Sequence, residues 1–315
     1  MREVKIKRRA LLITALLSLA VSCVVLAQQV GPTKSPSRTV ELNLIVTGSD
    51  KKSAPNIRKE DVQLIEDKVK QTVLSLEFDE RPVDCGLVID ASASMNKHLS
   101  ASLEAAKLII DNRRTGDQFF IERFIDSETI ENVQDFTTNR DDLVDALDSF
   151  LIGTGQSAVI DAVYLGANHL AERGAGNTRR KVLILLTDGE DRNSYYKYEV
   201  LIKQLQDKGV QVFAVGLTSE LSLEEDFSHL SPKDRAEKLL RDLTSEAGGR
   251  TFFPKNKKDL LGAATQIVAD LRSQFRLTYE STSDKKGFRK IDVKLTPASG
   301  EKLAAVLPRG YYFPN

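Results

Sequence analysis

The sequence has no tryptophan, only three histidines (His98, His169 and His229) and only two cysteines among its 315 residues. So few histidines disfavour chemistry that depends on histidine clusters. Cys23 lies in an N-terminal apolar run, so Cys85 is the only cysteine beyond it and a disulfide framework is excluded. A lone cysteine inside an apolar strand is most often a small buried hydrophobe, and we expect this of Cys85.

An excess of charge of either sign is also missing. The chain has 45 basic and 45 acidic residues, so nothing indicates a nucleic-acid partner. Its composition, 41% hydrophobic and 29% charged, is ordinary for a globular protein. The length allows one large domain or two smaller ones.

Residues 1–27 have the organisation of a signal peptide. MREVKIKRR carries five basic residues and one acid, and Ala10–Ala27 has no charge. This predicts cleavage after Ala27 and an exported protein that is periplasmic, on the cell surface or secreted. Two alternatives stay open, and either would bring the chain to a membrane. The apolar run could be an uncleaved anchor, or Cys23 could be lipidated, because Ala20–Cys23 resembles a bacterial lipobox.

Two β-rich segments flank the centre of the chain. Residues 28–38 are rich in Pro, Ser and Gly and predict a linker. In the segment 39–82, VELNLIV alternates as a half-buried strand does, and two further runs bracket Lys68–Lys70 as in a hairpin. Short strands return in the segment 274–315. Because each segment would be marginal alone, we expect the two to pair into one β-sandwich-like unit; two unrelated hairpins are the alternative.

The segment 83–273 alternates strands and helices. Its continuous apolar runs, CGLVID, KVLILLTDG and VQVFAVGL, are typical of strands buried on both faces. An α/β domain with a doubly wound, mostly parallel sheet and helices on both faces is predicted. The other expected elements are strands at 117–125 and 251–253 and helices at 102–111, 141–151, 158–172, 196–209, 236–249 and 258–273.

Oxygen-bearing side chains follow two of the apolar runs. Asp90 ends the first run, and Ser92 and Ser94 follow it at alternate positions. Asp188 ends the second run. Ligands of open α/β sheets bind outside the carboxyl ends of the strands, where these side chains should converge. Carboxylates and hydroxyls form a hard-ligand site that suits Mg²⁺, Mn²⁺ or Ca²⁺ rather than zinc.

The sequence Asp90-x-Ser92-x-Ser94 resembles the metal-ion-dependent adhesion site of von Willebrand factor A domains. That family has a second loop with a threonine, where GQSAVIDA here places Ser157, and a third element, an aspartate followed by glycine, which matches Asp188 in LLTDGED. The resemblance covers about 83–273. Gln156 and Ser157 depart from the family's glycine and threonine.

The resemblance implies direct metal contacts by Ser92, Ser94 and Ser157 and water-mediated contacts by Asp90 and Asp188. It implies a protein-binding module in which an Asp or Glu of a partner protein completes the coordination of the metal. The flanking β segments resemble those of an exported subfamily first noted in Acidobacteria.

Other functions fit these residues less well. GTGQSA (153–158) matches a dinucleotide fingerprint but follows an expected helix instead of the required strand. No GxSxG motif or triad supports a hydrolase, although His98 lies near the first loop. Ser92 stands where aspartyl phosphotransferases of the haloacid-dehalogenase type need a second aspartate. We therefore expect a binding protein and not an enzyme.

Two interpretations without a binding function remain for the same residues. The serines after Asp90 could simply cap a helix. The protein could also be a structural envelope component whose metal only stabilises the fold, or whose site is vacant.

Residues beside the expected metal site also need an interpretation. We interpret Asp161 as a local structural acid, and Glu190 and Asp191 as solvated surface. Tyr195, Tyr196 and Tyr198 could form an aromatic contact surface or pack with partial exposure.

Overall fold

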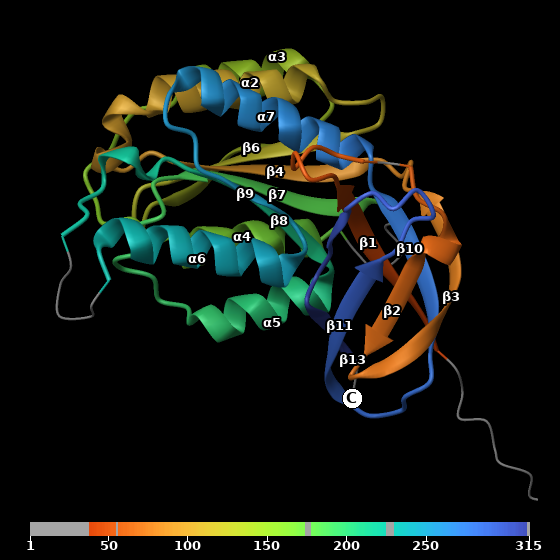
Figure 1. Ribbon diagram of the computed structural model, residues 1–315. Coiled ribbons are helices and arrows are strands. Elements are labelled where there is room, and N and C mark those ends of the chain that lie inside the picture. The colour runs from red at the N-terminus through yellow and green to blue at the C-terminus, as the bar shows by residue number, and fades with distance from the viewer. Residues whose placement is uncertain (1–37, 55, 174–177, 225–229, 314–315) are drawn as a thin grey trace, which may run out of the picture. The chain divides into compact units, whose positions relative to one another are not determined.

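The structure is a computed structural model, and it describes residues 38–54, 56–173, 178–224 and 230–313 (Figure 1). The predicted signal peptide, membrane anchor and lipidation site lie outside these ranges. Within them, residues 39–281 and those from 285 onward form one compact unit. No helix in the described ranges is long and apolar enough to cross a bilayer.

A six-stranded sheet forms the centre of the α/β domain. Every neighbouring pair is parallel except the antiparallel pair at one edge, β5 (Gln118–Phe124) and β6 (Ile130–Thr137). Strands β4 (Val83–Asp90) and β8 (Val210–Gly216) are buried along their whole length, as their continuous apolar sequences predict. The strand order is β6 (Ile130–Thr137), β5 (Gln118–Phe124), β4 (Val83–Asp90), β7 (Arg180–Thr187), β8 (Val210–Gly216) and β9 (Thr251–Phe252).

Helices cover both faces of this sheet (Figure 1). One core packs α2 (Leu99–Asp111), α3 (Arg140–Asp148) and α7 (Lys257–Arg272) against strand residues such as Cys85, which is buried and free. The second core packs α4 (Val159–Ala171), α5 (Tyr198–Lys208) and α6 (Pro232–Ala247) on the other face. The predicted doubly wound fold, with a mostly parallel sheet and helices on both faces, is confirmed.

Close approach across the second core requires a glycine in β4. A Cβ atom on Gly86 would lie 2.2 Å from Cζ of Phe120 and 2.6 Å from Cδ2 of Leu183. The neighbouring strands β5 and β7 therefore carry large side chains that fill the space beside Gly86.

The two β segments together form a second, antiparallel sheet. Strands from the two ends of the chain are interleaved in it, so the segments pair as expected and the α/β domain is inserted between them. The order is β12 (Ala304–Val306), β1 (Arg38–Thr47), β10 (Phe275–Ser281), β3 (Val69–Phe78), β2 (Val62–Glu66), β11 (Gly287–Leu295) and β13 (Gly310–Phe313). The expected hairpin is β2–β3, and its turn residues Asp67 and Lys68 have positive φ angles of 46° and 72°.

A buried ionic cluster joins the segment after β1 to the α/β domain. The carboxylate of Asp270 in α7 accepts hydrogen bonds from Nη1 of Arg250 at 2.7 Å and from Oγ of Ser53 at 2.7 Å. Arg250 also donates to the carbonyl oxygen of Lys51 at 2.7 Å. One arginine therefore connects α7 to the loop that follows β1.

Candidate functional site

The candidate site lies where β4 and β7 end side by side. These strands are parallel, and Ile89 is paired with Leu186, so Asp90 and Asp188 leave the sheet at the same edge. Ser92 and Ser94 lie at the start of a 3-10 turn, η2 (Ala93–Lys97), that leads into α2.

The three predicted serines meet around one point at this edge. Oγ of Ser157, in the loop before α4, lies 2.9 Å from Oγ of Ser92. Oγ of Ser92 lies 3.1 Å from Oγ of Ser94. Ser92 and Ser157 are buried, whereas Ser94 is exposed. The hydroxyls thus line a path from the buried aspartates to the surface.

Asp90 is fully buried, and protein groups reach both of its oxygens. Oδ1 accepts a hydrogen bond from the backbone N–H of Ser92 at 2.9 Å, and Oδ2 accepts one from Oγ1 of Thr187 at 2.6 Å. Oγ of Ser157 lies 3.0 Å from Oδ2. Burial raises the pKa of the Asp90 carboxyl to about 6, and the negative charge of Asp188 acts in the same direction.

Asp188 retains an unused oxygen. The residue is 2% exposed, and its Oδ1 accepts a hydrogen bond from the N–H of Glu190 at 3.0 Å. Its Oδ2 is buried and has no hydrogen-bond partner among the described residues. Gly189 turns the chain here at a φ of +82°, a conformation that favours glycine. An unpaired buried carboxylate oxygen is costly unless a cation or donor reaches it.

These donors fit a divalent cation. The site brings together two carboxylates and several hydroxyls, which are the hard oxygen ligands that Mg²⁺, Mn²⁺ and Ca²⁺ prefer. No group of three or more His, Cys, Asp or Glu side chains suited to a metal occurs in the described part of the chain. Serine hydroxyls would therefore have to supply ligands here, as the sequence predicts. All five predicted side chains lie at this edge, and their role as metal ligands stays a prediction.

Thr187 belongs to this network although the sequence analysis did not include it. Its hydroxyl donates to Asp90 and accepts a hydrogen bond from the N–H of Gly189 at 3.0 Å. The available signal was its position as the last residue of β7, immediately before Asp188.

The segment after β7 is fixed to the start of α4. Oδ2 and Oδ1 of Asp161 accept hydrogen bonds from the N–H groups of Tyr195 and Tyr196, both at 2.8 Å. Asp161 is 3% exposed, in agreement with its interpretation as a local structural acid. Oδ1 of Asp191 accepts from the N–H of Ile160 at 3.1 Å and from Oγ of Ser194 at 2.5 Å. Asp191 is partly exposed, so its interpretation as solvated surface holds only in part, because it also has this positioning role.

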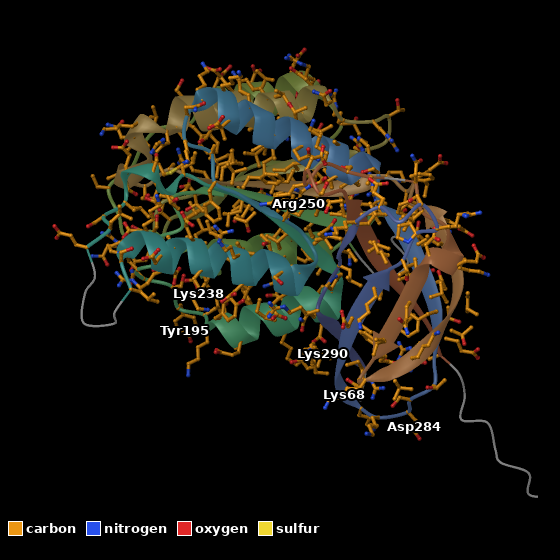
Figure 2. All side chains as sticks on the ribbon, viewed as in Figure 1. Lys68, Tyr195, Lys238, Arg250, Asp284 and Lys290 are labelled. Atoms are coloured by element: carbon orange, nitrogen blue, oxygen red, sulfur yellow. The ribbon has the colours of Figure 1, made fainter. Side chains whose placement is uncertain are left out.

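Tyrosines cluster on this segment. Tyr196 stacks on Tyr164 with ring centroids 3.7 Å apart, whereas Tyr195 is 85% exposed and is labelled at the surface in Figure 2. Tyr198, at the start of α5, is half-buried. Tyr196 and Tyr198 pack with partial exposure, as one of the two expectations has it, and an aromatic contact surface at the exposed Tyr195 stays a prediction.

Comparisons with known proteins assign the α/β domain to a family. The von Willebrand factor type A domain matches residues 84–266, more than half of the chain. The chain belongs to the von Willebrand factor type A domain family. Its resemblance to an acidobacterial subfamily stays a prediction. No curated protein matches the sequence.

The comparison with solved structures finds similar chains of low sequence identity. Proximal thread matrix protein 1 from the mussel byssus is 20% identical, with a TM-score of 0.50, covering 65% of this chain and 50% of its own. A structure of that protein with a zinc-occupied MIDAS motif is 21% identical, with a TM-score of 0.48, covering 64% of this chain and 48% of its own. An aerotolerance-related membrane protein from Bacteroides fragilis, with multiple mutations to serines, is 17% identical, with a TM-score of 0.46, covering 59% of this chain and 98% of its own.

Proposed function

We propose that this protein is an exported binding module whose affinity for a partner protein depends on a divalent cation at the carboxyl edge of the α/β sheet. The cation is Mg²⁺, held by Ser92, Ser94 and Ser157 directly and by Asp90 and Asp188 through water. An Asp or Glu of the partner supplies the remaining ligand. The module binds without catalysing a reaction, and export rests on the sequence of residues 1–27.

The observation that carries this proposal is the unpaired Oδ2 of Asp188. It is buried close enough to Asp90 for the two negative charges to repel each other. A cation would offset this repulsion and give the unpaired oxygen an electrostatic partner. The protein donors on both oxygens of Asp90 support an indirect role for that carboxylate.

Neutral serine ligands matter for partner binding. Hydroxyls reduce the positive charge of the ion less than carboxylates would, so the ion remains attractive to a further anionic ligand. The exposure of Ser94 supports access from outside, because the hydroxyl path reaches the surface at that residue. A partner carboxylate is the ligand best suited to that position.

A first experiment tests metal binding through thermal stability. Mg²⁺ at about one hundred times its Kd should stabilise the native state by about 2.7 kcal/mol and raise Tm by several degrees. Asp188→Asn should raise Tm without metal, because it removes the repulsion of Asp90, and should abolish the response to Mg²⁺. Ser94→Ala should weaken the response, whereas Ser100→Ala, an exposed serine on α2, should leave it intact.

The same titration identifies the metal. Parallel titrations with Mn²⁺, Ca²⁺ and Zn²⁺ test the expected preference for hard cations. An unchanged Tm with all four ions, or an Asp188→Asn variant that responds like wild type, would contradict a metal site here.

A second experiment tests partner binding. The immobilised protein is incubated with the envelope fraction of its source organism in Mg²⁺ or in chelator, beside Ser94→Ala and Ser100→Ala. We expect capture that requires Mg²⁺ and is weakened only by Ser94→Ala, and the partner's acid is then located by Asp→Asn and Glu→Gln substitution.

The structural role considered in the sequence analysis, with a metal that only stabilises the fold or with a vacant site, has one observation in its favour. Hydrogen bonds from Thr187 and Ser92 already satisfy Asp90 without an ion. A rise in Tm with Mg²⁺ together with equal capture in Mg²⁺ and in chelator would favour that role over binding.

A further inference from the structure

A cavity of about 280 Å³ lies at the opposite edge of the α/β sheet from the candidate metal site. Arg180 and Lys181 open β7 at this edge, whereas Thr187 closes β7 beside Asp90. The lining also includes residues at the ends of α5 and α6 and residues of β1 and β13. Its volume is close to the lower end of the range of pockets that hold small molecules.

Five cationic side chains line the cavity, and three of them, Arg180, Lys181 and Lys208, extend from its buried part to its surface. Arg180 is 3% exposed, Lys181 is partly exposed and Lys208 is exposed. None of the three forms an ion pair with a carboxylate among the residues that the structure describes. Asp79 and Asp117 lie near Arg180, and Asp84 lies near Lys181. These three acids already form ion pairs with other arginines, Arg81, Arg272 and Arg179 respectively.

The acids of the lining already have cationic partners. Glu41 lies 3.6 Å from Nη1 of Arg81, and Glu246 lies 2.9 Å from Nη1 of Arg309. Arg179, which also lines the cavity, contacts Asp84. Neither Glu41 nor Glu246 is thus free to neutralise the three unpaired cations, and the cavity keeps a positive surplus.

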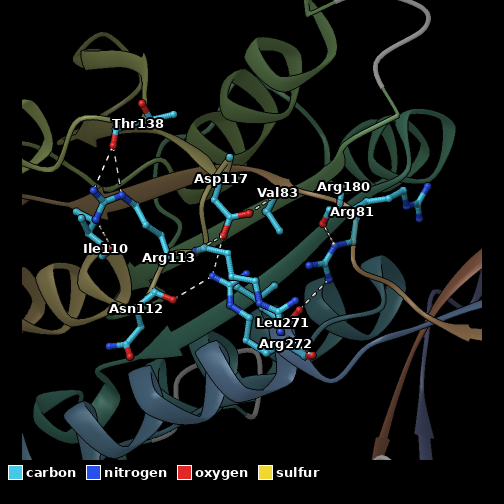
Figure 3. A network of polar contacts seen from close by, with 12 residues as sticks. Arg81, Val83, Ile110, Asn112, Arg113, Asp117, Thr138, Arg180, Leu271 and Arg272 are labelled. Carbon is cyan, nitrogen blue, oxygen red and sulfur yellow. Dashed lines mark hydrogen bonds and ion pairs between the residues drawn. The ribbon is translucent and has the colours of Figure 1, made fainter.

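Arg180 is fixed in place with one donor group unused (Figure 3). Its Nε donates to the carbonyl oxygen of Arg81 at 3.2 Å, and its Nη1 donates to that of Leu271 at 2.9 Å. Its Nη2 is buried and has no hydrogen-bond partner in the described part of the chain. Burial lowers the pKa of Arg180 to about 10, although the negative charge of Asp79 acts in the opposite direction. A buried cation with a free N–H is stabilised by an anion.

Helix capping accounts for only part of this arrangement. Nζ of Lys181 lies 3.5 Å from the carbonyl oxygen of Lys208 at the end of α5, where cations are favoured by the helix dipole. That contact is long and uses one of three N–H donors. It explains neither the side chain of Lys208 nor the free Nη2 of Arg180, which belongs to a strand.

We propose that this cavity binds a small oxyanion, a carboxylate or a phosphate. Lys208 and Lys181 attract the anion at the exposed side, and Arg180 provides positive charge and a hydrogen-bond donor at the buried side. Nearby polar groups are already used, since Nε2 of Gln211 donates to the carbonyl oxygen of Gly248 at 2.6 Å. The three cations are therefore the groups that recognise the ligand.

Isothermal titration calorimetry of the purified full-length chain tests this site. Phosphate and succinate are titrated separately, without divalent cations, at an ionic strength held constant with sodium chloride. We expect saturable binding of at least one of them, and the comparison shows whether phosphate or carboxylate is preferred. Sodium chloride titrated alone should give no saturable signal.

Variants locate the site. Lys181→Ala and Lys208→Ala should each weaken binding by about tenfold, the usual effect of losing a charge-assisted hydrogen bond. Lys290→Ala, an exposed lysine of β11 labelled in Figure 2, should bind as wild type does. Arg180→Met should abolish binding of the anion if the variant folds. If it does not fold, the two lysine variants test the site. Absence of saturable binding, equal binding of chloride, or wild-type affinity in both lysine variants would overturn the proposal.

Discussion

Glu122 is a buried acid that the proposed functions do not use, and its replacement by glutamine should stabilise the protein at neutral pH. The residue lies on β5 and is 4% exposed. Its Oε1 has no hydrogen-bond partner, and it forms no ion pair among the described residues. Gly166 of α4 packs over it, since a Cβ atom there would lie 3.6 Å from Oε2. Burial raises the pKa of Glu122 from 4.5 to about 8.

The sign and size of the effect follow from proton linkage. Between pH 4.5 and about 8 the unfolded chain is ionised at this residue while the folded chain keeps the proton. The free energy of unfolding therefore falls as pH rises through this window, by about 1.4 kcal/mol per pH unit. The accumulated loss is about 3 kcal/mol at pH 7 and under about 1 kcal/mol at pH 5.

Urea unfolding at several pH values measures this effect. Glutamine resembles the protonated acid, so Glu122→Gln should exceed the free energy of unfolding of wild type by under about 1 kcal/mol at pH 5 and by about 3 kcal/mol at pH 7. Glu128→Gln is the matched control, because Glu128 is exposed in the loop that follows β5. Parallel stability curves for wild type and Glu122→Gln from pH 5 to pH 8 would refute the reasoning.

Two further substitutions test polar contacts that hold the domain together. Asp270→Ala leaves Arg250 without its carboxylate and should lower the free energy of unfolding in urea by about 3–5 kcal/mol. The double variant with Arg250→Ala should recover part of this loss. Additive losses in the double variant would argue against coupling between the two side chains. Asp161→Ala removes the acceptor of the N–H groups of Tyr195 and Tyr196, so limited proteolysis should cut this segment faster than in wild type. The control is Asp207→Ala, which removes an acid of α5. Equal cleavage rates in the two variants would count against the positioning role of Asp161.

Much of the α/β domain could be predicted because local patterns determine it. The apolar run that ends at Asp90 matches a strand buried on both faces. Strand β6 was not predicted, because it lacks such a pattern. The sequence of β6, IENVQDFT, is mostly polar, because this edge strand is only partly buried. Neither continuous nor alternating hydrophobicity marks it, so the sequence analysis missed it.

The positions of Asp90, Ser92 and Ser94 at one edge followed from strand direction and residue spacing. Hydrogen bonds between distant residues did not, and Thr187 and Asp191 are the two examples. Thr187 resembles any other strand-end residue until its hydroxyl is seen to donate to Asp90. Asp191 resembles a surface acid until the start of α4 is placed beside it.

The pairing of early strands with late strands in the antiparallel sheet has a consequence for the order of folding. Strand β3 pairs with β10, and Glu77 faces Arg276 across about 200 residues of intervening chain. Loop closure over such a span is entropically expensive in a flexible chain. A folded α/β domain replaces that flexible span with a fixed separation between its two ends. The inserted domain would therefore act as the folding nucleus for the sheet that surrounds its termini, and β1–β3 would expose unpaired edges until β10 is in place.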